Sequence, residues 1–163
     1  MVVSVSNDEG NGVDIGAAFP AQAVRSGVRC SDWREAVTAA GELLVATGAA
    51  TDEYVDAIVR AVEELGPYIV LAPGIALAHA RPEDGGTAVG FSLVKLADPV
   101  EFGSAENDPV DLVFAFATPD KEQHVTALSK LADFIESGDN LARLREAGSD
   151  EELHNVIEEG TRT

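Results

Sequence analysis

The segment VDLVFAFA at residues 110–117 constrains the fold more than any other part of this 163-residue chain. It is apolar almost throughout, and Pro109 and Pro119 bound it. Continuous apolar runs of this kind are typical of strands in sheets that other elements cover on both faces. The segment therefore predicts a buried strand inside a layered domain.

Three further extended segments precede this strand. Residues 68–71 and 75–77 are short β-type runs, separated by Pro73 and Gly74. Residues 88–96, AVGFSLVKL, have the composition of a longer strand.

Helical signals lie on both sides of the strands. Asp32 is a potential N-cap with a glutamate three residues on, as in a capping box, and Ser149 has the same pattern. Thr51 is a potential N-cap of a second helix, and another helix is predicted from about Asp120. A short helix is expected over 139–146. Helices before, between and after strands indicate an α/β fold in layers, although this pattern leaves the strand order open.

The chain ends and composition predict one soluble domain. Residues 1–12 are polar and contain glycine and asparagine, so we expect a flexible N-terminus followed by a single domain over 13–163. No run is long and apolar enough to cross a membrane, and no signal peptide is recognisable. These features predict a cytoplasmic protein.

The formal net charge is −18, from 29 acidic and 11 basic residues. Binding to nucleic acid or to anionic lipid needs basic patches, so both partner classes are excluded. The acidic residues are spread along the chain, as on a solvated acidic surface. Salt-loving organisms use such surfaces for solubility, which leads to the hypothesis of a halophilic source.

Cofactor and metal signals are weak. Cys30 is the single cysteine, so an internal disulfide and a cysteine metal cluster are excluded. A nucleophilic Cys30 is conceivable, but a small residue packed near a helix start is the favoured interpretation. P-loop, GxGxxG, HExxH and GxSxG patterns are absent. A two-histidine metal site would lack a third ligand, so no cofactor and no metal is predicted.

Two of the three histidines are candidates for chemistry. His79 lies in LAPGIALAHARPEDGG, where an apolar strand ends and a polar loop begins. His124 begins a helical stripe with spacings of four, three and four, near a helix N-terminus that suits phosphate. Either one imidazole is a nucleophile supported by the other, or the two are unrelated residues. His154 has the pattern of a surface residue of the last helix and receives no role.

Two longer stretches carry a family resemblance. GPYIVLAPGIALAHARPEDG and VGFSLVKLADPVEFGSAENDPVDLVFAFATPDKEQHVTAL resemble the IIA proteins of the bacterial sugar phosphotransferase system (PTS). The class is the mannitol/fructose type, and the branch is the ascorbate type. The resemblance runs from about residue 32 to about residue 157.

The resemblance implies a fold and a relay. The fold is a three-layer α/β sandwich with a mixed β-sheet flanked by helices. An active histidine takes a phosphoryl group from the carrier protein HPr and passes it to a IIB protein, which serves the membrane IIC permease. His79 matches the phosphorylated histidine and His124 the second active-site histidine, so the implied enzyme is a phosphotransferase.

Two positions depart from the family pattern. Ala78 stands where a proline usually precedes the active histidine. Glu63 stands where mannitol-type members carry an arginine. Arg81, two residues after His79, is a hypothetical substitute for that positive charge and would stabilise the phosphoryl group.

Partner binding and substrate follow only from the resemblance. An apolar patch around His79 would dock the partners. Ile75, Leu77 and Val125 are the candidates for it, and the alternative is that they belong to the core. A regulatory IIA-like protein, controlling partners through its phosphorylation state, is the alternative function, and a binding module without phosphorylation is a third. Ascorbate is the favoured sugar, with fructose as the main rival and galactitol also open. The oligomeric state stays open.

Overall fold

The computed structural model describes residues 13–162, so the predicted flexible segment 1–12 lies outside the described residues. The strands are β1 (Val24–Val28), β2 (Val70–Ala72), β3 (Ile75–Ala78), β4 (Gly90–Val100) and β5 (Val110–Ala117). They form one sheet in the order β1-β4-β5-β3-β2. The predicted buried strand, β5, therefore lies at the centre of the sheet.

The sheet is mixed. The pairs β4–β5 and β2–β3 are antiparallel, whereas β1 runs parallel to β4 and β3 runs parallel to β5. Because β3 and β5 are parallel neighbours, their carboxyl ends lie at the same edge of the sheet, and the chain segments that follow both strands meet there.

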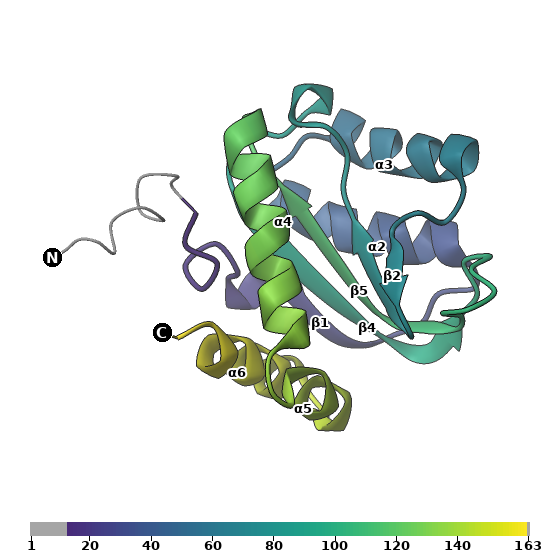
Figure 1. The fold of residues 1–163 in the computed structure, drawn as a ribbon, viewed down its shortest axis with the longest axis vertical. Helices are drawn as coiled ribbons and strands as arrows, with labels where there is room; N and C mark the ends of the chain where they lie inside the picture. Colours follow the sequence, from purple (N-terminus) through teal and green to yellow (C-terminus); the bar gives the residue numbers. More distant parts are fainter. Residues whose placement is uncertain (1–12, 163) are drawn as a thin grey trace, which may run out of the picture.

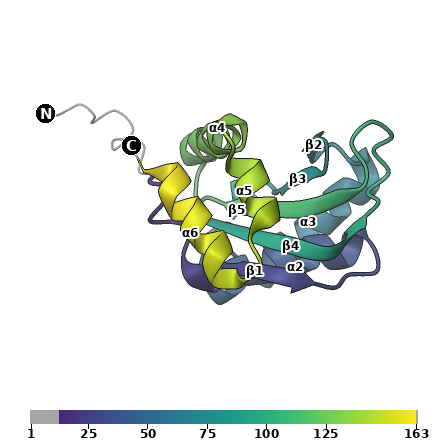
Figure 2. The ribbon, with the colours of Figure 1, turned by 90° about the horizontal axis from the view of Figure 1, so that it is seen from below.

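Helices cover both faces of the sheet (Figures 1 and 2). The helices α2 (Trp33–Ala46) and α3 (Asp52–Leu65) lie on one face, and α4 (Lys121–Glu136), α5 (Asn140–Glu146) and α6 (Asp150–Thr161) lie on the other. Each face has its own buried apolar cluster, and β5 contributes side chains to both by alternation. The predicted three-layer α/β architecture is confirmed.

Side-chain caps start three of the helices, at the predicted caps Asp32 and Ser149 and at the predicted helix start Asp120. Asp32, Asp120 and Ser149 each accept a hydrogen bond from the backbone N–H three residues on, at 2.8–3.1 Å. The prediction for Thr51 was wrong in its mechanism. Helix α3 does start after Thr51, but the hydroxyl makes no cap bond and instead donates to the carbonyl of Gly85 at 3.4 Å.

Strand β1 was not predicted, and β4 extends beyond its predicted end at residue 96. The β1 sequence, VRSGV, contains polar residues and glycine and has little β propensity. It forms a strand because it pairs with β4 at the sheet edge, where the N–H of Ser26 also donates to the carboxylate of Asp150 at 2.6 Å. Within residues 13–162, no helix combines the length and apolar character needed to span a bilayer.

Candidate active site

His79 is the first residue after β3, at the sheet edge described above. Its ring lies on the ring of Phe116 near the end of β5, with centroids 5.0 Å apart and planes inclined by 22°. The edge of Tyr68 faces the same imidazole, with centroids 6.0 Å apart and planes inclined by 83°. Two aromatic rings therefore hold His79 in a half-buried position.

One hydrogen bond defines the tautomer of His79. Its Nδ1 lies 2.9 Å from the carbonyl oxygen of Leu77. A carbonyl oxygen only accepts, so in the neutral ring Nδ1 carries the hydrogen and Nε2 carries the lone pair. Burial lowers the pKa of His79 below its ordinary value, the bond to Leu77 opposes this, and a charge on His124 lowers the pKa further. The ring is thus neutral near pH 7, with a free lone pair on Nε2, which is the state a nucleophilic imidazole needs.

His124 lies in the first turn of α4, which starts beyond the end of β5. Its ring centroid is 5.4 Å from that of His79 and 5.3 Å from that of Phe116. Among the described residues its Nδ1 is buried and has no hydrogen-bond partner. Burial lowers the pKa of His124, against the opposing effect of Glu83. The two candidate histidines therefore share one site, in which an imidazole nitrogen still lacks a partner.

The arginine proposed for the missing family charge makes other contacts. The side chain of Arg81 is 75% exposed, and its Nε lies 3.4 Å from Asp84 and 3.9 Å from Glu83. Within residues 13–162, no hydrogen bond or ion pair joins Arg81 to His79. Glu63, at the family arginine position, pairs with Arg34 of α2 at 2.8 Å. At the position where the resemblance to mannitol-type members leads one to expect an arginine, the protein therefore has a carboxylate paired with the guanidinium of Arg34.

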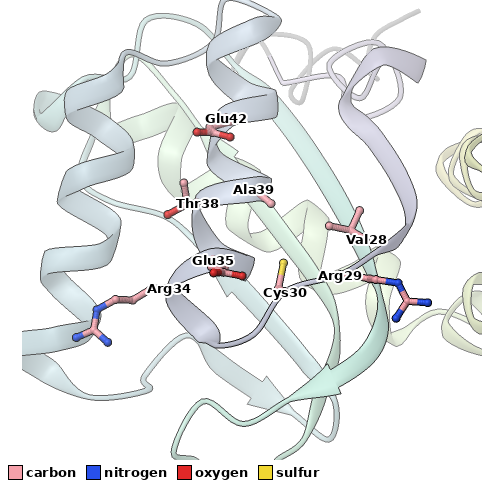
Figure 3. A pocket seen from close by; sticks show the side chains of 8 residues that line it. All are labelled: Val28, Arg29, Cys30, Arg34, Glu35, Thr38, Ala39 and Glu42. Carbon is pink, nitrogen blue, oxygen red and sulfur yellow. The ribbon is translucent and has the colours of Figure 1, made fainter.

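Cys30 and His154 lie outside this site. Cys30 is half-buried near the start of α2 and borders a cavity of about 340 Å³ between the end of β1 and α2 (Figure 3). Burial raises the pKa of its thiol, and Glu35 and Asp32 raise it further, which disfavours the nucleophilic thiolate. His154 has Nε2 3.0 Å from the carbonyl of Phe19 and links α6 to the segment before β1. Among the described residues, no group of three His, Cys, Asp or Glu side chains is arranged to hold a metal ion.

The structure corrects the predicted docking patch. Ile75 and Leu77 are 0% and 1% exposed, because both side chains belong to the core under α4. Of the two alternatives, the core is therefore right for both residues and the docking surface is wrong. Val125, beside His124, is 61% exposed and is available to a partner. Tyr68 is also partly exposed and contacts His79 directly.

Sequence reasoning missed Phe116 and Tyr68 as site residues. Phe116 has the pattern of an ordinary core position in the apolar run, and Tyr68 that of a strand residue. No local signal separates them from core, because β5 brings Phe116 beside the end of β3, and the pairing of β2 with β3 brings Tyr68 to the same place. A search for aromatic residues near the ends of the strands beside a candidate histidine would have found Phe116.

Comparisons with known proteins show the family to which the chain belongs. The family model described as phosphoenolpyruvate-dependent sugar phosphotransferase system, EIIA 2, matches residues 18–160. The ascorbate-specific PTS system EIIA component of Escherichia coli (strain K12) is 37% identical over 138 residues, which are 84% of this chain and 90% of that protein.

Two solved structures extend the comparison. The mannitol-specific cryptic phosphotransferase enzyme IIA of Escherichia coli has a TM-score of 0.80 at 28% identity, covering 90% of this chain and 99% of that one. Mannitol enzyme IIA of Escherichia coli, solved in complex with phosphorylated enzyme IIB, has a TM-score of 0.73 at 26% identity, covering 85% of this chain and 97% of that one. The chain belongs to the EIIA type 2 family of the phosphoenolpyruvate-dependent sugar phosphotransferase system.

Proposed function

We propose that this protein is a phosphoryl-relay IIA component whose acceptor atom is Nε2 of His79. The observation that carries the proposal is the neutral, half-buried imidazole whose Nδ1–H is bound by Leu77, which leaves the lone pair on Nε2. The family membership and the ascorbate-specific relative support a phosphotransferase role.

The relay consists of two balanced displacements. In the first, the P–N bond of phosphohistidine in HPr breaks as Nε2 of His79 forms a bond to phosphorus, and the electron pair of the broken bond returns to the HPr imidazole. In the second, a cysteine thiolate or a neutral histidine nitrogen of the IIB protein forms a bond to phosphorus as the Nε2–P bond breaks, and the electron pair of the broken bond returns to Nε2 of His79. Both steps gain mostly from positioning and from stabilising charge on the equatorial oxygens.

His124 is the group proposed to stabilise that charge. Its Nδ1 has no hydrogen-bond partner among the described residues, and the ring lies 5.4 Å from His79 in the first turn of α4. A phosphoryl dianion on His79 would favour a protonated, donating His124, and the helix N-terminus would add partial positive charge.

Arg81 is the second cation proposed to stabilise the phosphoryl group, and its position supports this role less well than that of His124 does. It can approach a phosphoryl group on His79 only by leaving Asp84 and Glu83, its partners in the 3-10 turn that follows the strand. If an Arg81→Ala variant transferred phosphate at the wild-type rate, Arg81 would have no role in phosphoryl transfer.

The proposed partners are HPr, a IIB protein and, through IIB, the membrane IIC permease. Val125 and Tyr68 expose apolar surface next to the two imidazoles and are proposed to contact HPr and IIB in turn. One structural neighbour is a complex of IIA with phosphorylated IIB, which supports a IIB protein as a partner. We further propose a cytoplasmic location. The net charge of −18 leads us to propose a salt-adapted source as well.

Ascorbate is the proposed sugar. The curated relatives that match most of the chain are named as ascorbate-specific components. Adding IIB proteins of the ascorbate, fructose and galactitol systems to the phosphorylated protein tests this: the IIB that removes the phosphoryl group fastest identifies the system.

Intact mass spectrometry after incubation with phosphorylated HPr tests the relay itself. One phosphoryl adduct is expected on wild type and none on His79→Ala. His154→Ala is the matched control, because it removes a histidine that lies in α6 and bonds to Phe19. An adduct on His79→Ala, or none on wild type with active HPr at matched salt, would contradict the proposal.

A further inference from the structure

Tyr54 connects α3 to the backbone on two sides of the candidate nucleophile. Its side chain is fully buried, so its hydroxyl needs polar partners inside the protein. The Oη lies 3.0 Å from the backbone N of Ala80, 2.8 Å from the carbonyl oxygen of Phe116 and 3.1 Å from that of Ala80. It accepts the N–H of Ala80 and has one hydrogen to donate, for which Phe116 offers the nearer acceptor.

These partners flank His79. Ala80 follows His79 in the chain, and Phe116 carries the ring on which the imidazole lies. Strands β3 and β5 pair as far as Ala78 and Ala115, after which their ladder stops. The Tyr54 hydroxyl bonds to both segments just beyond that point, in place of the next ladder bonds, and so sets the spacing between them.

The imidazole is therefore held through the backbone from both directions. On one side the Nδ1–H of His79 bonds to the carbonyl of Leu77, two residues earlier. On the other side Ala80 is bound by Tyr54 through its N–H. A shift of Ala80 changes the backbone dihedrals of His79 and moves Nδ1 relative to Leu77.

We propose that Tyr54 is a positioning residue for phosphoryl transfer, which keeps His79 in the Nδ1–H tautomer with Nε2 presented to the partner proteins. The inference rests on the proposed relay function. Tyr54 does not touch the reacting atoms and acts through Ala80 and Phe116.

Tyr54→Phe tests this with Ser92→Ala as the matched control. Ser92 is also buried, and its hydroxyl donates to the carbonyl of Ala40 at 2.8 Å, so each variant removes one buried, hydrogen-bonded hydroxyl group. The rate of phosphoryl transfer from phosphorylated HPr should fall about ten- to a hundredfold in Tyr54→Phe, since sub-ångström misplacement is costly in transfer reactions. In Ser92→Ala it should stay within about twofold, measured well below both melting temperatures.

The tautomer of His79 can be measured directly, and a general loss of stability would not change it. Long-range ¹H–¹⁵N spectra of the unphosphorylated protein should show Nδ1–H in wild type and in Ser92→Ala, and a tautomer mixture in Tyr54→Phe. A wild-type tautomer pattern in Tyr54→Phe would overturn the proposal, whatever the change in rate.

A measurement on wild type covers the case in which Tyr54→Phe does not fold. The amide hydrogen of Ala80 should exchange slowly, because Tyr54 accepts it; exchange as fast as in an open loop would overturn the proposal. The spectra are recorded without phosphorylation, so they test the role of Tyr54 independently of the relay. If HPr failed to phosphorylate the wild-type protein, the relay would be contradicted, and the spectra would still decide the role of Tyr54.

Discussion

The imidazole rings of His79 and His124 lie 5.4 Å apart with their planes inclined by 59°. One residue follows a strand and the other belongs to the first turn of a helix, yet both rings pack on Phe116. The alternative that the two histidines are unrelated in space is therefore wrong. Because the two rings are close, a positive charge on His124 lowers the pKa of His79.

The lowered pKa values of both histidines predict a pH-dependent stability. The unfolded chain binds protons on histidine near an ordinary pKa of about 6.5, whereas the folded pKa values lie lower. As the pH falls below about 6.5, the unfolded state therefore binds more protons than the folded state. The two histidines contribute to stability above that pH, and this contribution is lost as the pH falls further, through the lower pKa values of the folded state. Urea unfolding at about pH 8 and about pH 5.5 measures the loss.

The double variant His79→Gln/His124→Gln serves as the reference for that measurement. Because carboxylate titration is common to both proteins, the difference between them isolates the two imidazoles. The wild type should lose more free energy of unfolding on acidification than the variant. Equal losses would show that burial does not lower the pKa of either ring.

Lys95 is predicted to hold α5 against the sheet. Its Nζ donates to three carbonyls at the end of this helix, those of Leu144, Arg145 and Ala147, at 2.6–3.1 Å. Lys95→Met keeps the apolar stem but loses these bonds, so the free energy of unfolding should fall by about 1–3 kcal/mol. Lys121→Met, at an exposed position, should change it by less than about 0.5 kcal/mol. Similar values for both variants in urea unfolding would refute this.

Asp108 is predicted to organise the loop between β4 and β5. Its carboxylate accepts the backbone N–H groups of Phe102, Gly103 and Ser104 at 2.8–3.0 Å. Asp108→Asn replaces one acceptor oxygen by a donor and should cost about 1–3 kcal/mol in thermal or urea unfolding. Asp98→Asn is the control, since its exposed pair with Arg29 is worth at most about 1 kcal/mol. An Asp108→Asn protein as stable as Asp98→Asn would contradict this role.

Gly86 is predicted to be irreplaceable near the active site. A Cβ there would lie 2.1 Å from the carbonyl oxygen of Thr118, which follows β5. Gly86→Ala must push the loop after His79 away from β5, so it should lower both the melting temperature and the rate of phosphorylation. Gly148→Ala, whose Cβ would meet only a glutamate side-chain oxygen at 3.5 Å, should leave both unchanged. A Gly86→Ala protein with wild-type phosphorylation would show that the loop tolerates the shift.

The net charge of −18 predicts stabilisation by salt. Added KCl screens repulsion between the acidic side chains, so the melting temperature should rise steadily from low salt to about 2 M. Full stability without added salt would remove the support for a halophilic source.

Much of the fold was predictable because its signals are local. Asp32 and Ser149 start helices through bonds within the following turn, and the apolar run of β5 is long enough to identify a buried strand without knowledge of its neighbours. Strand β1 has no such signal, since its residues are extended only because β4 lies beside them. Ile75 and Leu77 were open to two interpretations in the sequence, because apolar character alone does not distinguish core from docking surface, and the structure places both in the core.

The sequence by itself determined the layered α/β class, most helix starts, and the two histidines that suit phosphoryl chemistry. Only the tertiary structure decided that the two rings meet on Phe116, that Leu77 takes the hydrogen of Nδ1, and that Tyr54 bridges the strands beside them. The physical reason is the range of the interactions. Caps and apolar patterns act within one element, whereas ring contacts and buried hydroxyl bonds form between elements that only the assembled sheet brings together.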